Sequence, residues 1–277
     1  MRLGGPIIAK EKLDPQKWVA AHEVRGYSAA YFPDVDDPSL IEDYVRVAAG
    51  ADLVIAEVGA WSNPLSQDPE AARQAISYCK KKLETAELAG ALCCVNIAGS
   101  RGEQWDGHDP ANLTADTFAL IVDTVRDIID HVQPERTYYT LEMMPWMYPD
   151  TVDSYLDLIR AIDRKAFAVH LDPVNIVTSP QLFYGNSALL EECFAKLGRY
   201  IRSCHAKDIV LGASMMVHLD EKRPGLGKLD YAQYLRQLAK LDRDVPLMLE
   251  HLDNEEEYGL AAGYIRSTAE AVGLRFV

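Results

Sequence analysis

Four strongly apolar segments of the chain each carry one polar residue that could take part in chemistry. Glu142 lies in TYYTLEMMPW, Asp172 in FAVHLDPVN, His205 in SCHAKD and Glu250 in LMLEHL. A charge left unpaired in an apolar interior costs several kcal/mol, so such residues pair with one another or bind a metal ion. Because alternate residues of a strand share a face, all four can converge if these segments are strands of one sheet.

Three carboxylates and one imidazole are a suitable ligand set for one divalent ion. Oxygen ligands favour Mn²⁺, our first choice, or Mg²⁺, and the imidazole extends the range to Co²⁺, Fe²⁺ or Zn²⁺. No cysteine is placed as a ligand, which argues against a structural zinc site. We therefore expect Glu142, Asp172, His205 and Glu250 to hold the metal; the alternative is a buried ion-pair network.

The same residues suit proton transfer next to a carbonyl group. That reaction needs a base near the C–H bond and a cation that holds the oxygens of the resulting enediolate. Glu142 and Glu250 lie on the fifth and eighth apolar segments, so their carboxylates can flank a bound sugar. Depending on the substrate, this pair could perform epimerisation, aldose–ketose isomerisation or dehydration.

Further candidates for substrate contacts lie close to these positions. His170 lies two residues before Asp172, and Lys207 lies two residues after His205. Each should therefore point inward with the ligand on its own strand. His170 is expected to bind substrate or support a ligand, unless it is a satisfied core histidine. Lys207 is expected to contact an oxyanion or hydroxyl, unless it pairs with the ligands. Other candidates near strand ends are Trp61, Asn96, Arg101 and Trp146. His251 is expected to face outward, toward the helices.

The elements that must position these residues follow a repeating pattern. Short β-branched and aromatic runs predict eight strands, at Leu3–Ile8, Ser28–Phe32, Leu53–Val58, Leu92–Ala98, Thr137–Met143, Phe167–Asp172, Ile201–Lys207 and Leu247–Leu252. Helical stretches are predicted at 14–24, 38–49, 68–90, 114–132, 150–163, 186–198, 230–241 and 254–272. Eight strand–helix units predict one (β/α)8 barrel domain over residues 1–277; an open doubly wound sheet is the alternative.

Composition narrows the choice of partners. The 277 residues include 28 basic and 42 acidic ones, a net charge of −14, which argues against binding nucleic acid or an anionic membrane surface. Three carboxylates and a divalent ion still sum to about −1, so a phosphorylated substrate would need Lys207 or Arg101 to offset its charge. We therefore expect a neutral sugar, polyol or keto-sugar as substrate.

Cysteine usage and the N-terminus indicate a cytoplasmic protein. The five cysteines form no Cys-x-x-Cys pair and are expected to be reduced core residues. The N-terminal MRLGGPIIAKEK does not resemble a signal peptide, and no apolar run reaches the roughly 18 residues of a membrane span. A homo-oligomer formed through the long segment from Gly99 to Leu113 is a further expectation that the sequence alone does not decide.

The order Glu, Asp, His, Glu at the ends of strands five to eight resembles the xylose-isomerase-like TIM-barrel superfamily. That group includes sugar isomerases and epimerases of the tagatose 3-epimerase type, inosose dehydratase, hydroxypyruvate isomerase and family 2 AP endonucleases. His205-Ala206-Lys207-Asp208 resembles its His-x-Lys-Asp motif, and the segment from Gly225 to Asp230 resembles its Gly-x-Gly-x-x-Asp stretch. The resemblance spans the chain, with its motifs strong from about residue 140.

The resemblance implies that Glu142, Asp172, His205 and Glu250 are metal ligands and that the two glutamates are the acid–base pair. Asn175 replaces a substrate-contacting histidine of the epimerases. Histidines that an endonuclease would need on strands three and four are absent. We thus expect a metal-dependent sugar isomerase or epimerase. The alternatives are a lyase or dehydratase of an inosose or keto-glycoside, and a metal-binding partner subunit without catalysis.

Overall fold

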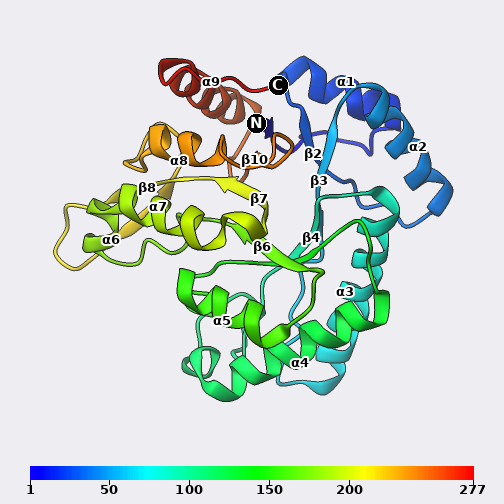
Figure 1. The fold of residues 1–277 in the computed structure, drawn as a ribbon, viewed down its shortest axis with the longest axis vertical. Coiled ribbons are helices and arrows are strands. Elements are labelled where there is room, and N and C mark those ends of the chain that lie inside the picture. The colour runs from blue at the N-terminus through cyan, green and yellow to red at the C-terminus, as the bar shows by residue number, and fades with distance from the viewer.

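A closed barrel of eight parallel strands forms the centre of the computed structural model, which describes residues 1–277 (Figure 1). Around the barrel the strands follow the order β1-β10-β7-β6-β5-β4-β3-β2. Their bounds are β1 Arg2–Gly4, β2 Ala29–Tyr31, β3 Val54–Gly59, β4 Cys93–Asn96, β5 Tyr139–Glu142, β6 Phe167–Leu171, β7 Ile201–Ala206 and β10 Pro246–Leu249. All eight predicted strands and the (β/α)8 fold class are confirmed.

Helices surround the strands in Figure 1, as the alternating pattern predicts. They are α1 Pro15–Arg25, α2 Pro38–Gly50, α3 Pro69–Ala89, α4 Ala115–Val132, α5 Val152–Ile162, α7 Asn186–Leu197, α8 Tyr231–Leu238 and α9 Glu255–Ala271. The carboxylates of Asp14, Asp37 and Asp68 accept hydrogen bonds from first-turn backbone N–H groups, and a proline follows each. These caps satisfy donors that the helix itself leaves unpaired, which is why the predicted starts are accurate.

Five smaller elements interrupt the connections between strands and helices. They are the 3₁₀ turns η1 Pro110–Leu113 and η2 Gly198–Tyr200, the short helix α6 Pro180–Tyr184, and the antiparallel hairpin of β8 Asp208–Leu211 and β9 Leu219–Lys222. The hairpin lies between the predicted strand that ends at Lys207 and the helix predicted from residue 230, where the sequence pattern predicts neither a strand nor a helix. Its second strand reads LDEK and is largely exposed, so it lacks the apolar alternation by which strands are recognised.

The side chain of Asp208 holds the base of this hairpin. Its carboxylate accepts hydrogen bonds from the backbone N–H groups of Ile209, Gly225, Gly227 and Leu229, each at 2.9 Å. A buried carboxylate is stabilised by several such donors. Because Asp208 directly follows Lys207, the turn fixes the backbone where β7 leaves the barrel.

The core is apolar, and the five cysteines are all buried and free, as predicted. None of the helices is long and apolar enough to cross a membrane.

We predict that Gly227→Ala destabilises the protein by about 1–3 kcal/mol, because a Cβ atom there overlaps the Asp208 carboxylate and the Ile209 carbonyl oxygen. Gly259→Ala in α9 is the matched control. No atom lies within 4 Å of its added Cβ, so the gain in helix propensity should stabilise the fold by about 0.5–1 kcal/mol. Urea unfolding measures both values, and equal effects of the two changes would contradict the role of Asp208.

Candidate metal centre

Four neighbouring strands bring the predicted ligands together. Glu142 is the last residue of β5, Asp172 follows β6, His205 lies near the end of β7 and Glu250 follows β10. Since parallel strands end at one face of a barrel, these side chains meet at its carboxyl end. Asp172 and His205 are fully buried, and the side chain of Glu250 is 13% exposed. One ligand atom from each residue lies within 4.8 Å of all the others.

The contacts within this cluster are close but poorly aligned for hydrogen bonding. His205 Nδ1 lies 2.7 Å from Glu250 Oε1, 3.4 Å from Glu142 Oε1 and 3.8 Å from Asp172 Oδ2. His205 Nδ1, Asp172 Oδ2 and Glu250 Oε1 are nevertheless buried without a hydrogen-bond partner. Buried polar atoms are normally satisfied. One imidazole nitrogen and three carboxylate oxygens lie within 4.8 Å of one another, and two of these oxygens also face the Lys207 ammonium, so the donor set is of the kind that binds a divalent cation.

Lys207 lies among the same carboxylates. Its side chain is 2% exposed, and Nζ lies 2.7 Å from Asp172 Oδ2, 2.6 Å from Glu250 Oε1 and 3.5 Å from Glu142 Oε1. Burial alone would lower the pKa of Lys207, but the surrounding carboxylates raise it well above its ordinary value. The ion pairs considered as its alternative role are present, and contact with substrate stays a prediction.

The loop after β6 fixes two of the carboxylates. Asp172 Oδ1 accepts hydrogen bonds from the backbone N–H groups of Val174 at 3.0 Å and Asn175 at 3.3 Å. The amide of Asn175 donates to Glu142 Oε1 at 3.0 Å, and its Oδ1 accepts from Lys207 at 3.4 Å. Asn175 thus lies beside the ligand set, although its predicted contact with substrate is not tested by this geometry.

The neighbouring charges govern the protonation states in the cluster. Burial raises the pKa of Glu250, but His205 and Lys207 outweigh it, and the pKa falls to about 2. The pKa of Asp172 is lowered in the same way by Lys207 and His205. The carboxylates, led by Glu250, raise the pKa of His205 despite its burial. Both acids are therefore anionic near neutral pH, the form that binds a metal ion.

A second polar group lies below this cluster, inside the barrel. Glu57 of β3 contacts His170 of β6 and Ser203 of β7, and its other oxygen faces His205. His170 is hydrogen-bonded to Glu57 through Nε2. Its side chain is fully buried, so no part of the ring is exposed to solvent. Sequence reasoning missed Glu57. A signal existed, since VIAEVG contains one acidic residue inside an otherwise apolar strand.

Two of the predicted substrate-contacting residues are engaged elsewhere in the loops. Asn96 is fully buried at the end of β4, where its amide accepts from the backbone of Ser62 and donates to Cys79 Sγ. Arg101 donates to the carbonyl oxygen of Leu65 at 2.7 Å. Both residues connect the β4 loop region to the β3 loop, and neither belongs to the ligand cluster.

The two predicted tryptophans lie at the rim. Trp61, 43% exposed, lines a cavity of about 320 Å³ that also contains Tyr31 and Glu57. Trp146, 39% exposed, donates through Nε1 to the carbonyl oxygen of Asp106 at 2.8 Å and so bridges the β5 and β4 loops. Trp61 has open space beside it for a substrate, whereas the polar edge of Trp146 is already bonded.

The expectation for His251 is wrong. Its ring does not face the helices but lies at the rim, 60% exposed, with Nδ1 3.2 Å from Glu221 Oε1 and Nε2 3.7 Å from Glu250 Oε2. Strand β10 ends at Leu249, and His251 has a φ of 55°. The alternation of a strand therefore no longer applies at this residue.

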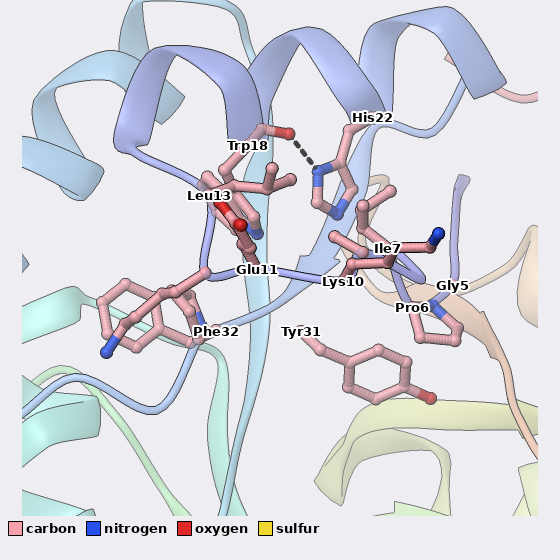
Figure 2. Close-up of a pocket in the computed structure, with 13 residues that line it drawn as sticks. Gly5, Pro6, Ile7, Lys10, Glu11, Leu13, Trp18, His22, Tyr31 and Phe32 are labelled. Atoms are coloured by element: carbon pink, nitrogen blue, oxygen red, sulfur yellow. Dashed lines mark hydrogen bonds between the residues drawn. The ribbon is translucent and has the colours of Figure 1, made fainter.

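A cavity of about 380 Å³ lies between the β1 loop, α1 and the end of β2 (Figure 2). Its walls include Pro6, Trp18, His22, Tyr31 and Phe32, and none of the four ligand residues lines it. Tyr31 connects the two places, because its ring centroid lies 6.4 Å from that of His205.

The family model described as xylose isomerase-like TIM barrel matches residues 17–268 of this chain. Among solved structures, D-psicose 3-epimerase from Clostridium cellulolyticum has 14% identity and a TM-score of 0.71, with 99% of this chain and 100% of that chain covered. Endonuclease IV from Thermus thermophilus has 16% identity and a TM-score of 0.72, with 98% of this chain and 100% of that chain covered.

A xylose isomerase-like TIM barrel protein from Mycobacterium smegmatis, in complex with magnesium, has 18% identity and a TM-score of 0.69, with 98% of this chain and 96% of that chain covered. A search of curated proteins finds no match. At these identities the structural likeness shows the fold, and an epimerase and a nuclease share it.

We predict that His22 makes stability depend on pH. Its Nδ1 donates to the Trp18 carbonyl oxygen at 2.8 Å (Figure 2), and burial lowers its pKa to about 4. An unfolded histidine titrates near 6.5, so as pH falls from 6.5 to 4 the unfolded state takes up a proton that the folded state does not. Up to about 3 kcal/mol of stability should be lost over this range.

The measurement is urea unfolding of the wild type and His22→Gln at several pH values between 4 and 7. The difference in unfolding free energy between the two should narrow toward pH 4. A constant difference would show that His22 does not titrate in this way.

We predict one tightly bound divalent ion per chain, detected by elemental analysis after incubation with Mn²⁺ and gel filtration. Asp172→Asn and His205→Ala should both lose it, because each removes one donor from the buried set. Glu257→Gln, which breaks a surface pair with Arg223, is the control and should retain the ion. At 100 times its Kd the ion should stabilise the wild type by about 2.7 kcal/mol. A wild type that binds no ion would refute the site.

Proposed function

The chain belongs to the xylose isomerase-like TIM-barrel family, and on that premise we propose that it is a divalent-metal-dependent isomerase or epimerase of a neutral sugar, polyol or keto-sugar. The proposed ligands are Glu142, Asp172, His205 and Glu250, and the proposed metal is Mn²⁺. Glu142 and Glu250 are the proposed acid–base pair.

The observation that carries this proposal is that two carboxylates border one point from different strands. Glu142 Oε1 and Glu250 Oε1 both approach His205 Nδ1, at 3.4 and 2.7 Å. They belong to β5 and the end of β10, with β6 and β7 between them in the barrel. A sugar carbon bound above this point would have one carboxylate near each of two faces, which is the arrangement that proton removal and return require.

The two glutamates have distinct electrostatic surroundings. His205 and Lys207 lower the pKa of Glu250, so it is a carboxylate at neutral pH, which is the form that a base requires, but the same cations make it a weaker base. Glu142 Oε1 is held by the Asn175 amide, which leaves its position fixed relative to Glu250. A divalent cation bound by the four residues would supply positive charge to the substrate oxygens on which negative charge develops.

Substrate geometry decides which reaction follows. When Glu250 takes a proton from one face of a carbon and a protonated Glu142 gives its own proton to the opposite face, the carbon is epimerised; Glu250 is then left protonated and Glu142 ionised, and exchange with solvent restores both. When one carboxyl moves the proton between adjacent carbons on one face, an aldose and a ketose interconvert. Loss of a β-hydroxyl as water from the same anion is dehydration, so a lyase acting on an inosose or keto-glycoside is the alternative within this site.

Charge supports a neutral substrate over a phosphorylated one. The ammonium of Lys207 already faces Asp172, Glu142 and Glu250, and Arg101 donates to a backbone carbonyl. A phosphate entering the cluster would therefore meet carboxylates without a free cation to pair with. The net charge of −14 likewise favours a small molecule over a nucleic acid, although a nuclease shares the fold.

We predict that Glu250→Gln lowers solvent-deuterium uptake into the reacting sugar by about 10²–10⁴-fold, the usual contribution of a positioned acid or base. The measurement is mass spectrometry of a panel of ketoses and inososes incubated with Mn²⁺-loaded protein in D₂O. The exchanged carbon identifies the reaction, and loss of water from the product identifies a lyase.

Glu221→Gln is the matched control, since Glu221 also faces Lys207, at 3.8 Å, but lies at the rim with its side chain 36% exposed. Its effect should stay below about fivefold, as for other partly exposed ion pairs. Metal-loaded wild type that exchanges no deuterium into any sugar of the panel would favour the alternative of a binding subunit. Equal loss in both variants would refute the role of Glu250.

A further inference from the structure

Glu57 is a fully enclosed carboxylate directly beneath the proposed metal ligands. It projects from β3 into the barrel, and its side chain has no solvent exposure. One oxygen, Oε1, accepts hydrogen bonds from His170 Nε2 at 3.0 Å and from the Ser203 hydroxyl. The other oxygen, Oε2, lies 3.5 Å from Nε2 of His205. Glu57 thus links the inner polar group to the imidazole above it.

The atoms that face each other across this gap are both unpaired. Glu57 Oε2 and His205 Nε2 are buried, and neither has a hydrogen-bond partner. A buried polar group left without a partner is destabilising, so each of these atoms needs one at this depth. Their separation of 3.5 Å is longer than the usual 2.9–3.0 Å of an N–H···O bond, and each is the nearest charged or ring-nitrogen group that the other faces across this gap.

We propose that Glu57 is a positioning residue for the metal ligand His205: it accepts the Nε2–H of the imidazole and thereby fixes the tautomer whose bare Nδ1 faces Glu142, Asp172 and Glu250. This inference rests on the proposed metal centre. Glu57 on β3 would thus orient a metal ligand that lies on β7.

Electrostatics supports this tautomer over the other. If His205 carried its proton on Nδ1, the lone pair of Nε2 would face the Glu57 carboxylate, and the N–H bond would block the metal position. The hydrogen bonds that His170 and Ser203 donate to Oε1 hold the Glu57 carboxylate with its other oxygen, Oε2, facing His205 Nε2. A carboxylate behind a ligating histidine also makes the imidazole a stronger donor to metal.

A different arrangement of the same atoms is the competing hypothesis. Glu57, His170 and His205 also offer donor atoms within 4.8 Å of one another. An ion bound there would use His205 Nε2, and Glu57 would be a ligand itself. The hydrogen bonds at Glu57 Oε1 favour the positioning role, because they already occupy His170 Nε2 and one of the two carboxylate oxygens.

The first test uses the wild type and needs no variant of Glu57. Long-range ¹H–¹⁵N spectra of histidine-labelled, Zn²⁺-loaded protein report which ring nitrogen of His205 carries hydrogen, with His205→Gln identifying the signals. We expect Nε2–H and a metal-shifted Nδ1. A proton on Nδ1 with the metal on Nε2 would overturn the proposal in favour of the inner site. A wild type that binds no Zn²⁺ would overturn the metal centre and this inference together.

The second test measures the Kd for Mn²⁺ alone in Glu57→Gln, with Ser203→Ala as the control that removes a hydrogen bond from Oε1 and leaves Oε2 in place. Loss of a carboxylate behind a ligating histidine weakens metal binding by about 10–100-fold, and we expect that range for Glu57→Gln. Ser203→Ala should stay within a few-fold of the wild type. Wild-type affinity in a folded Glu57→Gln would overturn the positioning role while leaving the metal centre intact.

Discussion

The burial of like charges at one end of the barrel constrains the rest of this structure. Glu142, Asp172 and Glu250 lie within reach of one imidazole nitrogen, and water that would ordinarily screen them is largely excluded. Carboxylates in such surroundings repel one another by several kcal/mol unless cations lie among them. His205 and Lys207 meet that need in part, and a divalent ion would meet the remainder. Hydrogen bonds from the neighbouring β6 loop hold two of the three carboxylates, Glu142 and Asp172, in place in spite of this repulsion.

That constraint explains why the supporting polar groups lie where they do. Asp208 ties the exit of β7 to the hairpin base through four backbone N–H groups, and Asn175 holds Glu142 from the β6 loop. Inside the barrel, Glu57 and His170 occupy positions that bulky aliphatic residues usually fill. An apolar pair there would pack without any cost of desolvation. A buried anion beneath a histidine is therefore better explained by what it does for that histidine than by stability.

The sequence is informative about strand ends and much less so about strand interiors. Glu142, Asp172 and Glu250 each stand beside an apolar run, so both the element and the position of the acid can be read from local pattern. Glu57 lies inside such a run, and only three-dimensional pairing with β6 and β7 reveals its partners. His251 could not be placed because β10 stops two residues earlier, and strand ends depend on barrel closure. The β8–β9 hairpin was missed because one charged, exposed strand carries no apolar period.

The cavity beside the β1 loop bears on the side from which a substrate could approach the two glutamates. It lies between the β1 loop and the end of β2, and β10 is the neighbour of β1 in the barrel, whereas β5 lies on the far side of β6 and β7. A sugar substrate of the proposed enzyme that approached the cluster from this side would meet Glu250 before Glu142. Epimerisation then requires the substrate to extend across the cluster, while proton transfer on one face does not. The length of substrate that the cavity and cluster accommodate together thus separates the two reactions.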